Sequence, residues 1–358
     1  MKKIVLTNDV IYGYASKASW AVGGAERYQW LLARALASSG WSVKVGVREA
    51  LSSGSRETID GVEFVGIGRG QFLSSCLRFL KTERPDWWFW AASYHLWGAL
   101  VETAKLAGVR TIFSAQFDTD VTPRHALSWR PRWWPLYAWG LIRTDKIFVQ
   151  HADQLSRLSP TLRSKASIRP GVVLQNGSHI PHVSREGYVA WVGVLREPKR
   201  PDRLIEIAGA SPDIQFVVCG GVSQHRTPEG YGERLIEAMR RLPNVKFLGQ
   251  VAPDEALRII ARAALLLSTS DGEGFPSVFL EAWSNGTPVV SLKIDPDHVI
   301  AKQGLGTVSD SVEKAVSDLR SLLDSPDKRE QIGVQARRHV AENHSESAVV
   351  STFERNLP

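Results

Sequence analysis

The sequence predicts an α/β protein built from two Rossmann-like, doubly wound domains. Short apolar runs alternate with helical patterns along the chain, which is typical of parallel sheets covered by helices on both faces. The alternation pauses at the polar stretch 175–187 and then resumes. A chain of 358 residues, 43% hydrophobic, is long enough to bury two cores. We expect an N-terminal domain over residues 1–176, a linker, and a C-terminal domain over residues 187–340.

Ten apolar runs are the predicted strands. In the first domain they are Lys3 to Thr7, Val43 to Val47, Trp87 to Ala91, Thr111 to Ser114 and Ile147 to Val149. In the second they are Tyr188 to Val192, Ile214 to Cys219, Val245 to Leu248, Leu265 to Ser268 and Val289 to Leu292. Two such domains that face each other would form a cleft at the carboxyl ends of their strands, where ligands of this fold class bind.

The stretch after the first strand predicts a helix that opens on two glycines. Five residues recur at helical spacing, namely Tyr28, Leu31, Leu32, Ala35 and Leu36. Gly23 and Gly24 stand at the start of this helix, where a backbone without side chains can approach a ligand and unsatisfied N–H groups favour an anion. From the pattern alone, an ordinary loop remains the alternative.

Composition indicates a reducing compartment. The two cysteines, Cys76 and Cys219, fit no zinc or redox spacing and are expected to be free, buried thiols. The first apolar run is too short for a signal peptide, and the apolar segment 87–101 is shorter than a membrane-spanning helix. We expect a cytoplasmic protein without a transmembrane segment.

The two halves of the chain carry opposite charge. Residues 1–176 contain 23 lysines and arginines and 13 acidic residues, whereas the rest of the chain contains 21 lysines and arginines and 24 acidic residues. The basic half includes the segment 124–143, which contains four arginines and four tryptophans. This composition suits peripheral contact with an anionic membrane at its inner face. A helix that packs its tryptophans inward is the alternative, and no nucleic-acid module is recognised.

The stretch DGEGFPSVFLEAWSNGTPVV, residues 271–290, predicts a strand, a turn, a helix and a strand. The helix covers 277–284, so the N–H groups of Phe275, Ser277 and Val278 lie at its N-terminus and suit a phosphate. Glu273 precedes the helix and Glu281 lies in its second turn, where both can accept hydrogen bonds from hydroxyl groups of one ligand. The alternative is a loop charge and a solvated helix residue.

These residues carry a resemblance. The E-x7-E pattern in residues 273–281, together with VGVLREPKRPDRLIEIA (192–208), FVVCGG (216–221), NVKFLGQV (244–251) and the early GGAER, resembles a retaining glycosyltransferase of the GT-B fold, family 4 type. The match runs in order along nearly the whole chain. It also implies that 344–358 is a helix that crosses back to the first domain.

The resemblance implies roles for individual residues. Lys199 would neutralise the diphosphate of a nucleotide-sugar, Glu273 would hold the transferred sugar, and Glu281 would hold the ribose. The remaining donor-binding positions would be Gly23, Gly24, Gly193, Gly220, Gln250, Val251, Gly274, Phe275, Pro276, Ser277 and Val278. A lysine and a helix N-terminus can stabilise a diphosphate leaving group without a metal, so neither a metal nor another cofactor is expected.

The chain departs from the family pattern at two positions. Val194 stands where the family has an arginine five residues before Lys199, and Arg196 is the candidate that would replace it as a catalytic cation. On the acceptor side, Gln116 stands where many relatives have a histidine, with Asp118 nearby. An amide cannot take a proton at neutral pH. The expected mechanism is therefore a front-face reaction in which the leaving phosphate receives the proton of the acceptor.

A metal-dependent transferase with a D-x-D motif is a weaker interpretation. Asp118 and Asp120 form one such pair, and Asp295 and Asp297 form another, but pairs of this kind occur by chance. The histidines show no ligand spacing.

The sequence therefore predicts a metal-independent glycosyltransferase that moves a hexose from a nucleotide-sugar to a glycan or lipid-linked acceptor. Cell-surface polysaccharide or lipopolysaccharide biosynthesis is the expected setting. Two alternatives stay open: a nucleotide-sugar epimerase or phosphorylase of the same fold, and a nucleotide-sugar-binding protein with a degenerate site.

Overall fold

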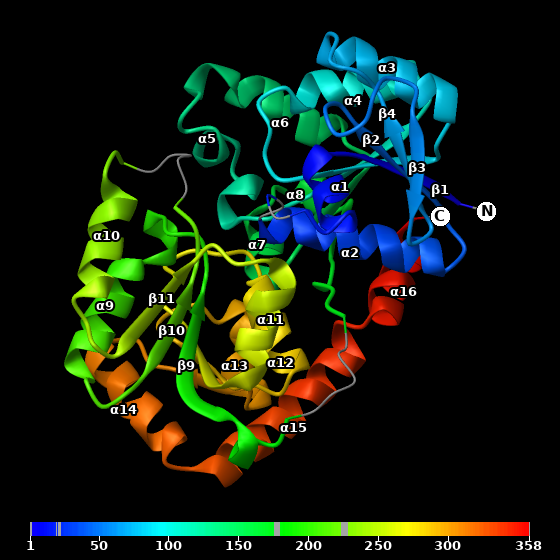
Figure 1. Ribbon diagram of the computed structural model, residues 1–358. Helices are drawn as coiled ribbons and strands as arrows, with labels where there is room; N and C mark the ends of the chain where they lie inside the picture. Colours follow the sequence, from blue (N-terminus) through cyan, green and yellow to red (C-terminus); the bar gives the residue numbers. More distant parts are fainter. Residues whose placement is uncertain (1, 19, 21–22, 175–179, 223–227, 358) are drawn as a thin grey trace. The chain divides into compact units, whose positions relative to one another are not determined.

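The computed structural model describes residues 2–18, 20, 23–174, 180–222 and 228–357. The chain divides into two compact units (Figure 1). Unit 1 comprises Met1–Val172 with Glu346–Pro358, and unit 2 comprises Val173–Ser345. The sequence-predicted boundary at residue 176, and part of the predicted linker, lie outside the described residues.

Unit 1 is built on an eight-stranded sheet in the order β3-β4-β2-β1-β5-β6-β7-β8. Its strands are β1 (Lys3–Thr7), β2 (Ser42–Val47), β3 (Arg56–Ile59), β4 (Val62–Gly66), β5 (Trp87–Ala91), β6 (Arg110–Ser114), β7 (Lys146–Val149) and β8 (Ala166–Ile168). All pairs are parallel except β3 with β4, which are antiparallel. The α/β class predicted from the alternation of strands and helices is confirmed.

Helices cover both faces of this sheet (Figure 1). They are α1 (Asp9–Ala15), α2 (Gly24–Ser38), α3 (Phe72–Glu83), α4 (Trp97–Leu106), α5 (Pro123–Ala126), α6 (Trp134–Arg143), α7 (Ala152–Arg157), α8 (Pro160–Arg163) and α16 (Glu346–Asn356), with the 3-10 turns η1 (Asp118–Val121) and η2 (Pro131–Trp133). On one face Trp88 and Phe113 pack with Trp97 of α4. On the other, Phe353 of α16 stacks on Phe148 with ring centroids 4.7 Å apart. The last helix of the chain is thus part of unit 1.

Unit 2 has a six-stranded sheet in the order β11-β10-β9-β12-β13-β14, with every pair parallel. The strands are β9 (Glu186–Val192), β10 (Phe216–Cys219), β11 (Val245–Gly249), β12 (Ala263–Ser268), β13 (Val289–Ser291) and β14 (Gly306–Val308). Every residue of β12 is buried, as expected for a central strand covered on both faces.

Two cores lie on the two faces of the second sheet. The helices are α9 (Pro201–Ala210), α10 (Tyr231–Arg240), α11 (Pro253–Arg262), α12 (Ser277–Ser284), α13 (Val299–Gln303), α14 (Val312–Leu323) and α15 (Pro326–Asn343), with the 3-10 turns η3 (His182–Ser184), η4 (Glu197–Lys199) and η5 (Pro296–His298). Residues of α9, α10 and α14 share one core, while those of α11, α12 and α15 share the other. The second core includes Trp283 of α12, whose indole N–H donates to the carbonyl of Leu305 at 3.1 Å.

Four strands and one helix are absent from the sequence-based prediction. β3, β8 and β14 are short and only partly buried, so they lack the apolar run that marks a strand. β4 is apolar and largely buried, yet it is not among the predicted strands. The helix α1, between β1 and Gly23, is likewise not among the predicted elements. Both cysteines are free and buried, as predicted, and burial raises the pKa of Cys76 to about 12. No described helix has the length and apolarity needed to cross a bilayer.

The carboxyl end of α12 is anchored by a buried histidine. His182 of η3 is 2% exposed, and its Nε2 contacts the carbonyl oxygen of Gly286 at 2.8 Å, next to the end of α12. Burial, with a contribution from nearby Arg185, lowers the pKa of His182 to about 4. A protonated imidazole is therefore disfavoured in the folded state.

The pKa of His182 predicts an acid-dependent loss of stability. Because the folded pKa lies below the unfolded value of 6.5, the stabilisation is present above pH 6.5 and falls as pH drops towards 4. The free energy of unfolding should fall by about 3 kcal/mol over this pH range. Urea unfolding between pH 7 and pH 4 should show a weaker pH dependence in His182→Gln than in the parent. His298→Gln, which alters an exposed histidine of unit 2, serves as the control. Parallel pH profiles for the parent and His182→Gln would contradict the assignment.

Candidate active site

A lysine and a glutamate meet at the carboxyl edge of the sheet in unit 2. β9 and β12 are neighbouring parallel strands, so the loops that follow them leave the sheet side by side. Lys199 lies at the end of η4 in the loop after β9, and Glu273 lies in the loop after β12. Their side chains form an ion pair, with 17% of Lys199 and 9% of Glu273 exposed. The structure thus brings together two of the predicted catalytic residues.

Asp271 fastens the two loops to each other. Its carboxylate accepts hydrogen bonds from Arg200 and Arg203, each at 2.7 Å, and its backbone N–H donates to the carbonyl of Pro198 at 2.9 Å. Burial would raise the pKa of Asp271, but the two arginines outweigh it and hold the pKa below the usual value. The carboxylate therefore stays ionised and keeps the loops together near neutral pH.

A second link fixes the backbone of Lys199. The indole N–H of Trp191, in β9, donates to the hydroxyl of Thr269 at 3.0 Å. That hydroxyl donates to the carbonyl oxygen of Lys199 at 2.8 Å. Trp191 and Thr269 are both buried, so these two hydrogen bonds connect the backbone of Lys199 to the sheet. Asp271, Thr269 and Trp191 are not among the sequence-predicted site residues, although Asp271 opens the stretch 271–290 and Trp191 lies in the predicted strand Tyr188 to Val192.

Glycines let the loops of three strands approach each other. A Cβ atom on Gly220 would lie 1.8 Å from the carbonyl oxygen of Gly193, so no larger residue fits there without movement of the backbone. The Gly220 N–H donates to the carbonyl of Gly249 at 2.8 Å, and the Gly193 N–H donates to that of Cys219 at 3.0 Å. Gly193 and Gly220, both predicted donor-binding residues, therefore line the edge where the strands β9, β10 and β11 end.

Helix α12 begins directly after Glu273. It covers Ser277–Ser284, as the sequence predicted, with Pro276 as its N-cap and no side chain capping its first turn. Gly274 and Pro276 are buried, while Phe275, Ser277 and Val278 are half-buried. N–H groups in the first turn of a helix have no acceptor within the helix and carry partial positive charge. The first turn of α12 directly follows the loop that carries Glu273, the ion-pair partner of Lys199.

Glu281 is 6% exposed, which rules out the interpretation of this residue as a solvated helix charge. A buried carboxylate on the core-facing side of α12 requires polar partners.

The other predicted donor residues of unit 2 also follow strands. Gln250 and Val251 come directly after β11, the edge strand of the sheet; Gln250 is exposed and Val251 half-buried. Arg196 opens the turn that ends at Lys199, whose N–H donates to the Arg196 carbonyl at 3.0 Å. Val194 is half-buried in the same loop.

The predicted glycine pair lies in unit 1. Gly23 is the N-cap of α2 with φ of 111°, a value that favours glycine, and Gly24 is the first residue of the helix. Glu26, in the first turn, approaches Gly23 so closely that a Cβ there would lie 2.2 Å from its carboxylate oxygen. The N-terminus of α2 therefore already has a carboxylate beside it.

Gln116 and Asp118, the predicted acceptor-side residues, follow β6 in unit 1. Gln116 is 7% exposed, and its amide donates to the hydroxyl of Ser114 at 3.2 Å. Asp118 contacts Nε2 of His151 at 2.8 Å and accepts from Gln154 at 3.0 Å. Burial opposes ionisation of Asp118, yet these contacts lower its pKa. Both side chains are thus engaged in organising the loop after β6.

Two aspartates of the D-x-D pairs, Asp120 and Asp295, accept backbone hydrogen bonds from residues near them in the chain. Asp120 is buried and accepts backbone N–H groups of Gln116 and Phe117 at 2.8 and 3.1 Å. Burial raises the pKa of Asp120 despite these bonds. Asp295 accepts the N–H of Ile300 at 2.7 Å. Within the described part of the chain, no three His, Cys, Asp or Glu side chains gather as metal ligands would.

Comparison with known proteins identifies the family. Residues 178–339 match the family described as glycosyl transferases group 1, and residues 23–177 match the glycosyl transferase 4-like domain. A D-inositol 3-phosphate glycosyltransferase from Mycobacterium sp. (strain KMS) is 30% identical over 71% of this chain and 62% of its own length. One of the same name from Corynebacterium diphtheriae is 31% identical over 43% of this chain. The present chain spans only 38% of that relative's length.

Solved structures share the fold. Sucrose-phosphate synthase from Thermosynechococcus elongatus is 14% identical, with a TM-score of 0.77 over 99% of this chain and 98% of that one. The Anabaena protein HepE, solved in complex with UDP and glucose, is 15% identical to this chain, with a TM-score of 0.74. The match covers 100% of this chain and 99% of the HepE chain. The chain therefore has the GT-B fold and belongs to the group 1 glycosyltransferases of the family 4 type.

Proposed function

We propose that this protein is a retaining hexosyltransferase that moves a sugar from a nucleotide-sugar to a glycan or lipid-linked acceptor. The observation that carries the proposal is the Lys199–Glu273 pair, held beside the N-terminus of α12 by the Asp271 clamp. Synthesis of a cell-surface polysaccharide or lipopolysaccharide is the setting we infer for it.

The donor would bind at the carboxyl edge of the sheet in unit 2. A nucleoside diphosphate is the leaving group of such a transfer, and its developing charge needs fixed cationic groups. Lys199 and the N–H groups of Phe275, Ser277 and Val278 offer them, and Arg196 lies three residues from the lysine. Glu273 would bind hydroxyl groups of the sugar and Glu281 those of the ribose. The HepE protein, which shares the fold and was solved with UDP and glucose, supports this class of donor.

We propose that the transfer needs no metal. A divalent cation would serve to neutralise the diphosphate, and the lysine with the helix N-terminus supplies that charge instead. Asp120 and Asp295 accept backbone N–H groups from residues close to them in the chain, and Asp118 contacts the ring of His151. Gly193, Gly220, Gln250 and Val251 would complete the donor site around the base and the phosphates.

The proton of the acceptor hydroxyl would pass to the leaving phosphate. Gln116 has no basic nitrogen, and its amide already donates to Ser114. Attack on the same face of the sugar as the leaving group places the hydroxyl next to a phosphate oxygen. This front-face path retains the configuration of the sugar and requires no protein base.

Substitution of the central pair tests the proposal. Lys199→Ala and Glu273→Gln should each lower kcat by a factor of about 10² to 10³, because charge stabilisation of the leaving group or positioning of the sugar is lost. Release of nucleoside diphosphate from a nucleotide-sugar, with an acceptor mixture, provides the assay. The control is Lys246→Ala, which alters an exposed lysine of unit 2.

Three results would contradict this assignment. They are unchanged activity in both variants, sugar turnover that needs no acceptor, and turnover that depends on free phosphate. The last two would favour an epimerase and a phosphorylase, respectively. Donor binding without any turnover would favour the degenerate binding protein.

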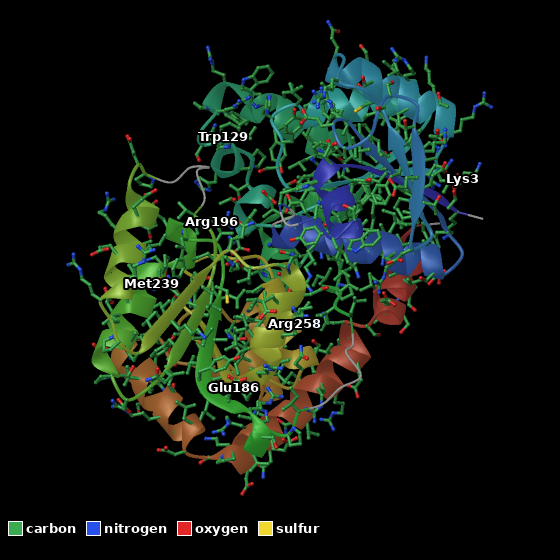
Figure 2. All side chains as sticks on the ribbon, viewed as in Figure 1. Lys3, Trp129, Glu186, Arg196, Met239 and Arg258 are labelled. Carbon is green, nitrogen blue, oxygen red and sulfur yellow. The ribbon has the colours of Figure 1, made fainter. Side chains whose placement is uncertain are left out.

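We also propose that the segment 124–143 of unit 1 contacts an anionic membrane surface. Trp129, Trp133 and Trp139 are 40%, 38% and 49% exposed, which contradicts an inward-facing arrangement of these three side chains. Figure 2 shows Trp129 on the helical region of α5 and α6. Arg130 lies 4.5 Å from the ring centroid of Trp129, and Arg143 lies 5.6 Å from that of Trp139. The segment contains no acidic residue, so its charge is wholly positive.

Removal of two charges should weaken vesicle binding. Arg130→Gln with Arg132→Gln should reduce partitioning onto vesicles of phosphatidylglycerol and phosphatidylcholine by about 30-fold at low salt, at about 1 kcal/mol per charge. Arg78→Gln with Lys81→Gln removes the same charge from the exposed side of α3 and should have little effect. Co-sedimentation measures both. Equal losses in the two double variants, or no binding by the parent, would exclude a specific membrane surface.

A further inference from the structure

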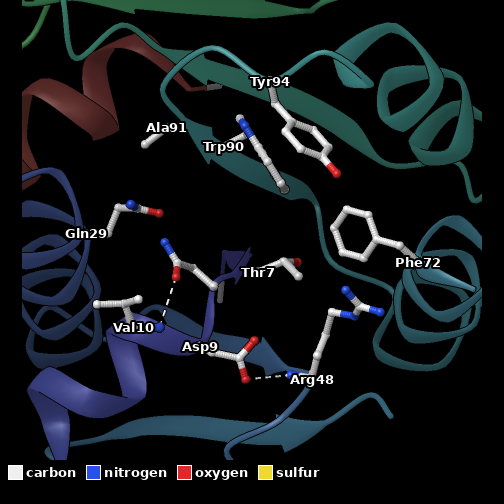
Figure 3. A pocket seen from close by; sticks show the side chains of 10 residues that line it. Thr7, Asp9, Val10, Gln29, Arg48, Phe72, Trp90, Ala91 and Tyr94 are labelled. Carbon is white, nitrogen blue, oxygen red and sulfur yellow. Dashed lines mark hydrogen bonds between the residues drawn. The ribbon is translucent and has the colours of Figure 1, made fainter. Parts of the chain in front are cut away.

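Unit 1 contains a pocket of about 360 Å³ at the carboxyl edge of its own sheet (Figure 3). It is lined by Thr7, Asn8, Asp9, Val10, Gln29, Arg48, Phe72, Trp90, Ala91 and Tyr94. Thr7 ends β1, Ala91 ends β5 and Arg48 directly follows β2, three strands that are adjacent in the sheet. None of these residues was predicted as a site residue, and neither Gln116 nor Asp118 lines the pocket. Its volume is in the range of small-molecule sites.

One wall of the pocket is aromatic. The rings of Trp90 and Tyr94 lie 5.3 Å apart with an interplanar angle of 34°, and the ring of Phe72 stands edge-on to Tyr94 at 6.2 Å. In Figure 3 the three rings gather on the side of the pocket opposite Val10 and Asp9. Flat aromatic faces bury apolar surface while their rims remain open to polar groups. The C–H face of a sugar ring is a matching ligand surface.

The opposite side carries planar amides. Asn8 accepts the N–H of Val10 with its oxygen at 2.9 Å, which leaves its NH₂ group for another partner. Gln29 is 4% exposed and donates to the carbonyl of Ala25 at 3.2 Å. Figure 3 shows its amide directed from α2 towards the pocket. Amides that present a donor and an acceptor side by side suit the neighbouring hydroxyl groups of a sugar.

Arg48 is the cation of the pocket. Its guanidinium group donates to the carbonyl of Gly70 at 3.2 Å and lies 5.0 Å from the ring centroid of Phe72. Its Nε is buried without a hydrogen-bond partner. Across the described ranges of the chain, Arg48 forms no ion pair with a carboxylate. A buried donor without a partner costs free energy, which an anionic ligand would recover.

Asp9 does not cancel this charge. It is the acidic residue of the lining, and its Oδ1 accepts the backbone N–H groups of Arg48, Glu49 and Ala50 at 2.8, 2.7 and 3.0 Å. Three amide dipoles compensate the carboxylate, and the same bonds fix the chain where β2 ends. Asp9 therefore positions Arg48 through its backbone and leaves the guanidinium group for a ligand.

We propose that this pocket receives a sugar unit of the acceptor that carries an anionic group, either a carboxylate or a phosphate. Arg48 binds the anion, Trp90 and Tyr94 cover one face of the ring, and Asn8 and Gln29 bind its hydroxyl groups. This inference rests on the proposed transferase function and narrows its acceptor to an acidic glycan or a phosphorylated sugar.

Direct binding measurements test the inference. Glucuronic acid, glucose 6-phosphate, glucose and inorganic phosphate would be titrated into the full chain by ligand-observed NMR, each with and without UDP. The acidic sugars should bind at least tenfold more tightly than glucose and more tightly than inorganic phosphate, because a charge-assisted hydrogen bond adds to the ring contacts. A preference for one acidic sugar over the other would distinguish a carboxylate from a phosphate as the natural group.

Two variants of Arg48 assign the preference to its side chain. Arg48→Gln should remove the advantage of the acidic sugars over glucose, while Arg48→Lys should keep part of it, since a lysine retains the charge without the planar fork. Arg78→Gln, an exposed arginine of α3, should change nothing. Circular dichroism confirms that each variant is folded.

Three results would overturn the inference: equal affinity for glucose and the acidic sugars in the parent, an unchanged preference in Arg48→Gln, and no binding of any sugar. Nucleotide binding measured on the same samples separates this failure from failure of the transferase proposal. If a nucleotide binds and the acidic preference is absent, only the acceptor assignment falls. If neither nucleotide nor sugar binds, both fall.

Discussion

The candidate site of unit 2 depends on one half-buried ionic clamp at the edge of a parallel sheet. Parallel strands bring all their carboxyl ends to one edge, so the loops after β9 and β12 are neighbours although about seventy residues separate them in the chain. Asp271 then joins these loops through Arg200 and Arg203. Each arginine donates to one oxygen of the Asp271 carboxylate at 2.7 Å, and Arg200 also forms an ion pair with Asp202. The meeting of Lys199 with Glu273 follows from this arrangement.

The same edge explains how a helix N-terminus and a lysine come to share one site. Gly193 and Gly220 allow the loops to lie closer than side chains would permit, and the Trp191–Thr269 link holds the lysine from the sheet. The cationic groups are therefore in place before a ligand arrives. Preorganised charge is more effective than charge that must move into position, because no free energy is lost in reorganisation. A cationic group is positioned in advance in unit 1 as well, because Asp9 fixes the backbone at the end of β2 and so positions Arg48.

The sequence predicted the elements whose signal is local. Buried strands such as β12 are continuous apolar runs, and α12 carries its own start and stop signals in Pro276 and Gly286. Short edge strands such as β3 and β14 lack that signal, because their side chains are partly exposed to solvent and need not be apolar. The pocket of unit 1 was not predicted because its lining comes from separate elements that only the fold brings together; Arg48, Trp90 and Gln29 have no common spacing. The burial of Glu281 was likewise undecided, since helical spacing alone did not reveal which face meets the core.

We infer that Lys199 and the loop before α12 bind a nucleoside diphosphate without a metal. Isothermal titration of UDP, and of the other nucleoside diphosphates, into the parent chain and into Lys199→Ala in the presence of EDTA tests it most directly. We expect one nucleoside diphosphate to bind the parent in EDTA and to bind Lys199→Ala at least tenfold more weakly, because charge-assisted contacts to the phosphates are lost. Binding that requires a divalent cation, or equal affinity for the parent and the variant, would contradict it.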